Sequence, residues 1–271
     1  MRAEDLLKVP LHRRIDWATN CAQGADQCGR LRAVFCCLAR DVAKNTANVM
    51  SWFRECSGLF KESSLLVYEN DSQDDTAAEY LRHAQDEQVT VLTQKLGARK
   101  FGSVDSQERT TQLAAFRNAC RDAILDKHGH AFDVAIVFDS DLHAYPVMGL
   151  ANTFAHWGKF DVMTSNGLSF RRQGGWRLVQ YDAYAWREGV WDKPPNRSVN
   201  HRVFRIGDPL LPLLSAFGGL AVYTSPAFRA GRYCGGECEH VRFHLSLRTF
   251  GFDRLFLNPS MTVFENYRES R

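Results

Sequence analysis

Two acids that follow an apolar run are the residues with the clearest chemical use in this chain. Asp139-Ser140-Asp141 comes directly after residues 134–138, which are apolar throughout. A buried strand that ends in two carboxylates one residue apart places hard oxygen ligands at the edge of a sheet. Mn²⁺ or Mg²⁺ held there can bridge two phosphate oxygens and neutralise a diphosphate leaving group. Acids also follow strands because strands end in solvated turns, so the context has to decide.

A second polar group follows an earlier predicted strand at residues 65–68. Glu69, Asn70 and Asp71 come next, and their side chains can hydrogen-bond a ribose or the edge of a base. Residues 74–76 are explained fully by capping of the helix that they begin. Capping leaves Glu69 and Asn70 unexplained, so a binding role and a structural role stay equally open for them.

Two arginines lie on a long amphipathic helix predicted at residues 105–127. Arg109 and Arg117 are eight residues apart, which places them about 80° apart on a helical wheel. A guanidinium fixed on the pocket side suits a diphosphate. The alternative is a solvated helix arginine, which fits Arg117 less well because its neighbours are apolar.

An alternating α/β pattern has to position these groups. Hydrophobic periodicity predicts strands at 31–38, 65–68, 89–92, 134–138 and 162–164, with helices at 45–56, 74–84 and 105–127. This order predicts an α/β sandwich with a mainly parallel sheet. Ligands of such sheets bind beyond the carboxyl ends of the strands, where the polar groups at 39–41, 69–71 and 139–141 fall.

The order and spacing of these motifs resemble the nucleotide-sugar half of GT-A glycosyltransferases. The resemblance rests on Glu-Asn-Asp-Ser-x-Asp-x-Thr from residue 69, Arg117-Asn118 within a helix, and Phe-Asp-Ser-Asp from residue 138. It is strongest towards fungal capsule-associated mannosyltransferases and similar bacterial and viral enzymes, and it covers residues 33–164. It implies a GT-A, Rossmann-like fold whose mostly parallel central sheet is flanked by helices, with an acceptor-side region at the C-terminus.

The resemblance also implies partners and site residues. The donor would be a UDP- or GDP-linked sugar and the acceptor a glycan or another hydroxyl compound, with Mn²⁺ or Mg²⁺ as cofactor. Ala39 and Arg40 would lie near the nucleotide, with Glu69 and Asp71 near the base or ribose. The carboxylates at 139 and 141 would hold the metal.

The C-terminal third would supply the acceptor side. A strand predicted at 215–223 is entered through glycines, and Gly219 would let a sugar approach the backbone closely. If the transfer inverts the anomeric configuration, Glu237 or Glu239, at the start of a helix predicted at 239–250, would be the general base. If it retains the configuration, as the resemblance to capsule-associated mannosyltransferases suggests, no dedicated base is required, and both outcomes stay open. A helix N-terminus lowers a carboxylate's pKa, which suits a binding role equally well, and Glu239 has helix capping as its alternative.

Three histidines are candidates for completing the metal site. His240 and His244 are four residues apart and share one helix face, the spacing of a metal-ligand pair. His240 is the favoured ligand because it adjoins the acidic motif, and His143 is a third candidate. A satisfied structural histidine is the alternative for each.

The periodic pattern of apolar residues is lost between residues 167 and 212, and a long irregular stretch of this kind predicts a binding loop. A final strand is predicted at 255–257. The aromatic residues of this stretch are Trp176, Tyr181, Tyr184, Trp186 and Trp191. Their faces can stack on sugar rings, but the core of a small loop subdomain is the favoured interpretation.

Length and composition bound the remaining possibilities. The 271 residues suit a single domain, divided here into an N-terminal extension (1–30), a nucleotide-sugar half (31–166) and an acceptor half (167–271). The net charge of +3 is too weak for nucleic-acid binding. No apolar run is long enough for a membrane span, and no signal-peptide core is evident. A cytoplasmic protein is therefore predicted, and this location is compatible with peripheral membrane association.

The eight cysteines are predicted to be thiols. Cys234 and Cys238 would bind zinc only with a second pair of matching spacing, which the sequence lacks.

Two other functions stay open. A sugar-nucleotidyltransferase shares the α/β core and metal site but carries a glycine-rich basic loop after the first strand, and residues 39–44 contain no glycine. A non-catalytic carbohydrate-binding or scaffold protein is disfavoured by the intact acids at 139 and 141.

Overall fold

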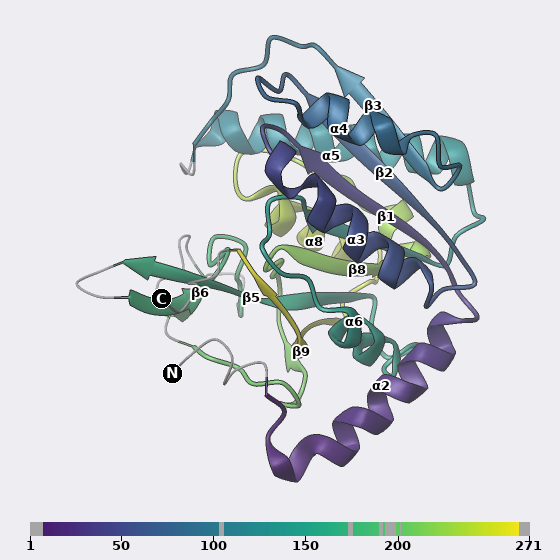
Figure 1. Ribbon diagram of the computed structural model, residues 1–271. Coiled ribbons are helices and arrows are strands. Elements are labelled where there is room, and N and C mark those ends of the chain that lie inside the picture. Colours follow the sequence, from purple (N-terminus) through teal and green to yellow (C-terminus); the bar gives the residue numbers. More distant parts are fainter. Residues whose placement is uncertain are drawn as a thin grey trace.

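A nine-stranded sheet lies at the centre of the computed structural model (Figure 1), which describes residues 8–102, 106–172, 176–189, 192, 199–200 and 202–265. The strands in these ranges are β1 (Arg32–Ala39), β2 (Glu62–Asn70), β3 (Val89–Gln94), β4 (Val134–Asp139), β5 (Val162–Arg172), β6 (Trp176–Gln180), β7 (Leu211–Pro212), β8 (Leu220–Thr224) and β9 (Leu255–Phe264). The helices are α2 (Arg14–Cys28), α3 (Thr46–Ser57), α4 (Thr76–His83), α5 (Gln107–His128), α6 (Val147–Phe154), α7 (Ser225–Ala230) and α8 (Glu239–Thr249), with short 3₁₀ turns η1 (Leu11–Arg13) and η2 (Ala43–Asn45).

The strand order is β3-β2-β1-β4-β8-β5-β9-β7, with β6 paired to β5. Strands β3, β2, β1 and β4 are mutually parallel, and β8 runs antiparallel to its neighbours β4 and β5. The predicted α/β fold with a mainly parallel sheet is therefore confirmed. The parallel pairing brings the carboxyl ends of β1, β2 and β4 to one edge, with Leu38 beside Asp139 and Ala39 beside Glu69.

Strand β1 is apolar from Ala33 to Ala39, which suits a strand that helices cover on both faces. Val34 and Cys36 belong to the core formed with α5, α7 and α8, whereas Phe35 and Cys37 belong to the core formed with α3, α4 and α6. In Figure 1, α3 and α4 lie in front of the sheet while α5 and α8 lie behind it. The two-residue alternation of strand side chains produces this division.

The elements predicted around the site are confirmed. Strands β1 to β4 and helices α3, α4, α5 and α8 begin and end within a few residues of their predicted bounds. The N-cap residue of α4, Asp75, makes no side-chain capping hydrogen bond, but Asp74 just before it accepts from the Thr76 amide through Oδ1 at 3.0 Å. Helix α5 is capped by Ser106, which accepts from the Arg109 amide.

The prediction of an irregular stretch from residue 167 is partly wrong. Strand β5 continues to Arg172 and forms an antiparallel hairpin with β6, which projects from the body in Figure 1. The strand predicted at 215–223 starts only at Leu220, because Gly218 and Gly219 have φ of +64° and +89° and form a turn. Trp186 is buried and stacks on Phe204 at 6.1 Å, so the core interpretation holds for it. Trp191 and the Trp176 side chain lie outside the described residues.

The segment before β1 folds as helix α2 and packs against α6. The contact is so close that a Cβ atom on Gly24 would lie 1.8 Å from the Ala151 carbonyl oxygen. Helix α2 is therefore fitted to the core of the same domain.

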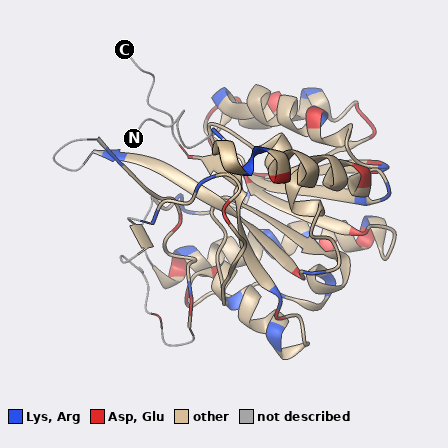
Figure 2. Cartoon of the chain, turned by 90° about the horizontal axis from the view of Figure 1, so that it is seen from below, with Lys and Arg blue, Asp and Glu red and all other residues tan. Residues whose placement is uncertain are grey.

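Positions of basic residues (blue) and acidic residues (red) are interspersed along the helices in Figure 2. No helix in the described part of the chain is long and apolar enough to cross a bilayer. All eight cysteines are free thiols, and Cys234 is exposed while Cys238 is buried.

Candidate functional site

A cleft of about 660 Å³ opens at the carboxyl ends of β1, β2 and β4. The predicted site residues that line it are Ala39, Arg40, Asn70, Arg109, Arg117, Asp139, Ser140, Asp141, Glu239 and His240. The cleft thus brings together two acidic motifs that are far apart in the sequence: the acids after β4 and the acid that begins α8.

Asp139 is held in place from two sides. Its Oδ1 accepts from Arg117 Nη2 at 3.2 Å, and its Oδ2 accepts from the Tyr181 hydroxyl at 3.1 Å. Burial raises the pKa of Asp139 to about 6, because the loss of hydration and the nearby Asp141 carboxylate outweigh the stabilising contact with Arg117. Asp141, by contrast, is exposed on the cleft wall.

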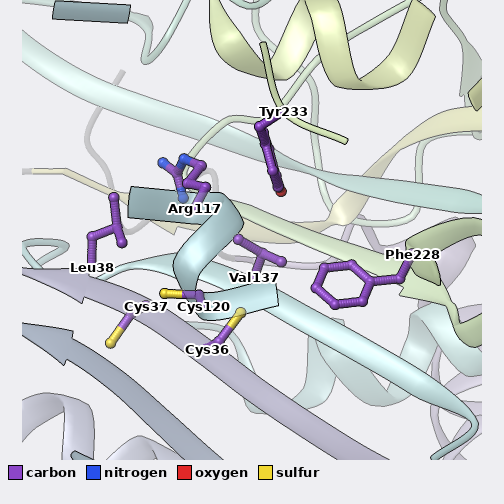
Figure 3. Close-up of a pocket in the computed structure, with 8 residues that line it drawn as sticks. All are labelled: Cys36, Cys37, Leu38, Arg117, Cys120, Val137, Phe228 and Tyr233. Atoms are coloured by element: carbon purple, nitrogen blue, oxygen red, sulfur yellow. The ribbon is translucent and has the colours of Figure 1, made fainter. Parts of the chain in front are cut away.

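Arg117 joins the two acidic groups of the cleft. It is buried on α5, and its Nε donates to Glu239 Oε1 at 3.1 Å while Nη2 donates to Asp139. Figure 3 shows Arg117 and Tyr233 at a cavity of about 10 Å³ lined also by the thiols of Cys36, Cys37 and Cys120. Because these surroundings are largely apolar, the carboxylates of Asp139 and Glu239 are the polar groups that hold the Arg117 guanidinium.

The two acids predicted as bases occupy different environments. Glu239 is buried at the start of α8, lines the cleft and is bound by Arg117. Glu237 accepts at 2.7 Å from Nη2 of Arg187, itself a buried residue. Glu239 therefore faces the cleft, whereas Glu237 anchors Arg187.

The predicted histidines also differ. His240 is 2% exposed, lies flat on Phe217 with a ring-centre distance of 3.6 Å, and has no hydrogen-bond partner at either ring nitrogen among the described residues. His244 is bound by Ser215 and Tyr223 at 2.9 and 3.0 Å, and burial lowers its pKa to about 3. His244 is thus a satisfied structural histidine, and His143 is exposed.

The residues predicted to lie near the nucleotide also differ from one another in their surroundings. Arg40 lines the cleft and donates to the Ala98 carbonyl at 2.8 Å. Glu69 is buried and accepts from the Ser72 amide. Hydrogen bonds from Asn70 and from the amides of residues 96–98 lower the pKa of Asp71 to about 2, against the opposing effect of desolvation. Glu69 and Asp71 therefore organise the loops beside the cleft.

Ser140 and Gly219 serve the backbone around Asp139. The Ser140 hydroxyl donates to the Leu38 carbonyl at 2.7 Å, which ties β4 to β1. The Gly219 carbonyl accepts from the Asp139 amide at 2.9 Å. A Cβ on Gly219 would lie 3.1 Å from the Tyr181 ring and 3.0 Å from Leu142, so glycine lets this turn pack behind Asp139.

Known structures were compared with this arrangement. No protein-family model and no curated protein matches the chain. The mannosyltransferase PcManGT from Pyrobaculum calidifontis, solved in complex with GDP-Man and Mn²⁺, is 11% identical with a TM-score of 0.54 over 92% of this chain and 66% of that one. A mycobacterial protein is 17% identical with a TM-score of 0.50 over 93% of this chain and 72% of that one. The chain has the GT-A fold.

A third structure, residues 1–349 of TarS from S. aureus, is 10% identical with a TM-score of 0.49 over 86% of this chain. This chain spans 60% of that TarS structure and 66% of PcManGT. The GT-A fold rests on the similarity to PcManGT, and the chemistry of this chain has to be argued from its own cleft.

The two carboxylates at the end of β4 are ligands of the type that Mn²⁺ or Mg²⁺ would need, the ions expected from the resemblance to GT-A enzymes. Carboxylate oxygens are the ligands that Mg²⁺ prefers, and it usually takes one or two of them together with substrate phosphates and water. Among the described residues, no three His, Cys, Asp or Glu side chains form a group that could hold a metal. Asp139 and Asp141 supply two carboxylates at the end of β4, the number of protein ligands that such a magnesium site usually takes.

Two cleft residues had no specific signal in the sequence. Tyr181 was expected to stack on a sugar or fill a core, but its hydroxyl holds Asp139. Asp182 lines the cleft next to it and was not singled out at all. Both follow β6, and only the hairpin of β6 with β5 brings them to the site.

Proposed function

We propose that this chain is a metal-dependent glycosyltransferase, of the hexosyl-transferring type, that moves a sugar from a UDP- or GDP-linked donor to a glycan or another hydroxyl acceptor. The observation that carries the proposal is the pair Asp139 and Asp141 at the end of β4, opening into a cleft of a GT-A fold. That PcManGT was solved with GDP-Man and Mn²⁺ supports this choice of ligands.

Asp139 and Asp141 would hold Mn²⁺ or Mg²⁺, which supplies neutralising charge for the diphosphate as it leaves. Arg117 keeps Asp139 oriented from behind and adds a fixed positive charge to the same wall. Arg109, Arg40 and Lys100 line the cleft and would bind the remaining phosphate and ribose oxygens.

Glu239 suits a positioning role. Its Oε1 atom accepts from Nε of the buried Arg117 at 3.1 Å, so this carboxylate is already engaged in holding another side chain. We therefore assign Glu239 to holding Arg117, and Glu237 to holding Arg187. His240 as a third metal ligand stays a prediction.

Thermal unfolding with and without ligands tests the proposal. Mn²⁺ together with UDP or GDP should raise the melting temperature, because a ligand at 100 times its Kd stabilises the native state by about 2.7 kcal/mol. The nucleotide with EDTA is the control and should have a much smaller effect. If no nucleoside diphosphate stabilises the protein in the presence of metal, a non-catalytic role is favoured instead.

A further inference from the structure

Asp182 is a carboxylate in the cleft without a hydrogen-bond partner for one of its oxygens. Its Oδ2 atom is buried and unpaired among the described residues. Its backbone has a left-handed φ of 60°, which is uncommon outside glycine, although Asp and Asn tolerate it best. An unpaired buried carboxylate oxygen in a strained turn is unfavourable for folding alone and is typical of functional sites.

The turn that carries Asp182 is fixed to the rest of the site. The Tyr181 amide donates to the Gly167 carbonyl at 2.9 Å, and the Ala185 amide donates to the Asp182 carbonyl at 3.0 Å. The Tyr181 hydroxyl donates to Asp139. Asp182 is therefore held in a defined place next to the proposed donor site.

The charges around Asp182 compensate its carboxylate only in part. Arg117 donates from Nε to Glu239 and from Nη2 to Asp139, so its hydrogen bonds go to two other acids. Burial raises the pKa of Asp182 well above its usual range, and the carboxylates of Asp139 and Glu239 add to this effect, against the opposing effect of the Arg117 and Arg109 charges. A group in this state favours a proton or a hydrogen-bond donor from a ligand.

A second polar group without a hydrogen-bond partner lines the same cleft. His240 is 2% exposed, and its two ring nitrogens have no hydrogen-bond partner among the described residues, with Nε2 3.6 Å from Glu239 Oε1. Asp182 interacts electrostatically with Cys238 and Glu239, the two residues directly before His240, so it lies near the start of α8. Among the described residues, neither Asp182 nor His240 forms a metal-holding group of three with the other acids.

We propose that Asp182 and His240 form the subsite for the acceptor hydroxyl, with Asp182 as the catalytic base. This inference rests on the proposed glycosyltransferase function. The acceptor O–H bond breaks and its proton passes to the Asp182 carboxylate, while the oxygen forms a bond to the anomeric carbon. The bond from that carbon to the donor phosphate breaks, and the nucleoside diphosphate leaves with the electron pair. Such a step inverts the anomeric configuration.

The test separates donor binding from turnover. Wild-type protein, Asp182→Asn and the exposed control Asp126→Asn are titrated with GDP and UDP in the presence of Mn²⁺ by calorimetry. Release of nucleoside diphosphate from GDP-mannose and UDP-N-acetylglucosamine is then measured with methyl glycosides, or water, as acceptor. Asp182→Asn is nearly isosteric and suits a left-handed backbone, so its fold should be retained.

Asp182→Asn should bind the nucleotide within about twofold of wild type, while turnover falls on the order of 10²- to 10³-fold, as for loss of a general base. Turnover within threefold of wild type, or a parallel loss of nucleotide binding, would overturn the inference. A wild-type protein that neither binds nucleotide nor turns over any donor would instead overturn the proposed function.

His240→Gln provides a second test that does not depend on the behaviour of Asp182. The KM for the acceptor should rise about tenfold, with the Mn²⁺ concentration for half-maximal activity unchanged, because one hydrogen bond to the acceptor is lost. A raised Mn²⁺ requirement with an unchanged acceptor KM would assign His240 to the metal and contradict the proposed subsite.

Discussion

At the scale of single residues, the two acids after β4 have different supports and therefore different roles. Asp139 is held by Arg117 and Tyr181, whereas Asp141 is exposed on the cleft wall. In the proposed metal site, Asp139 would be the fixed carboxylate and Asp141 the one free to adjust to the incoming donor. Each acid can be tested separately.

Asp141→Ala should abolish metal-dependent donor turnover, on the order of 10²-fold or more, because a carboxylate of the proposed metal site is lost. Its stability should stay within about 0.5 kcal/mol of wild type, since the side chain is exposed. Turnover assays and urea unfolding measure the two quantities. Full activity in this variant would rule out the proposed metal site.

Asp139 should make stability depend on pH when no metal is present. The folded protein raises the pKa of this carboxyl to about 6, from 3.8, so the folded state binds the proton more tightly than the unfolded state. The stability of wild type relative to Asp139→Asn should therefore fall by on the order of 2 kcal/mol as the pH rises from about 4 to about 7. Urea unfolding in EDTA measures this difference. A difference that does not change with pH would mean that Arg117 keeps Asp139 fully ionised.

At the scale of elements, close backbone contacts set the positions of the helices around the sheet. Helix α2 approaches α6 at Gly24, where a Cβ atom would overlap the Ala151 carbonyl. Helix α6 in turn packs against β9 and α3. The N-terminal helix therefore supports the layer on which one face of the sheet rests.

Gly24→Ala should lower the free energy of unfolding by about 1–3 kcal/mol, because the added methyl group forces α2 away from α6. Gly58→Ala is the matched control, since its Cβ atom would meet no other atom closer than 3.6 Å. Urea unfolding of both variants checks the prediction. Equal stabilities would show that α2 does not depend on this contact.

The sequence predicted the elements that carry strong periodicity and missed those that depend on tertiary contacts. Strands β1 and β4 were recognised because both of their faces are buried, and α5 by its long amphipathic pattern. Helices α2 and α6 were not identified, since α2 combines glycine with many polar residues and α6 is only eight residues long. The sequence predicts only the start of β5, at 162–164, and an irregular stretch from residue 167 in place of the β5–β6 hairpin, which explains why it does not place Tyr181 and Asp182 at the site.

At the scale of the whole molecule, both predicted halves share one sheet. Strand β8, from the C-terminal half, pairs with β4 and β5 of the N-terminal half. The acids after β4 and the residues that begin α8 are therefore positioned by the same rigid core, which lets Arg117 contact Asp139 and Glu239 together. Precise positioning of this kind is what transfer between two bound substrates requires.

A crystal structure of the protein with Mn²⁺ and GDP or UDP would test the central claim most directly. Anomalous scattering from manganese should give a peak beside the carboxylates of Asp139 and Asp141, with the diphosphate oxygens on its other side. A nucleotide bound with these two side chains turned away from it, or a cleft without metal and nucleotide at saturating concentrations, would contradict the account.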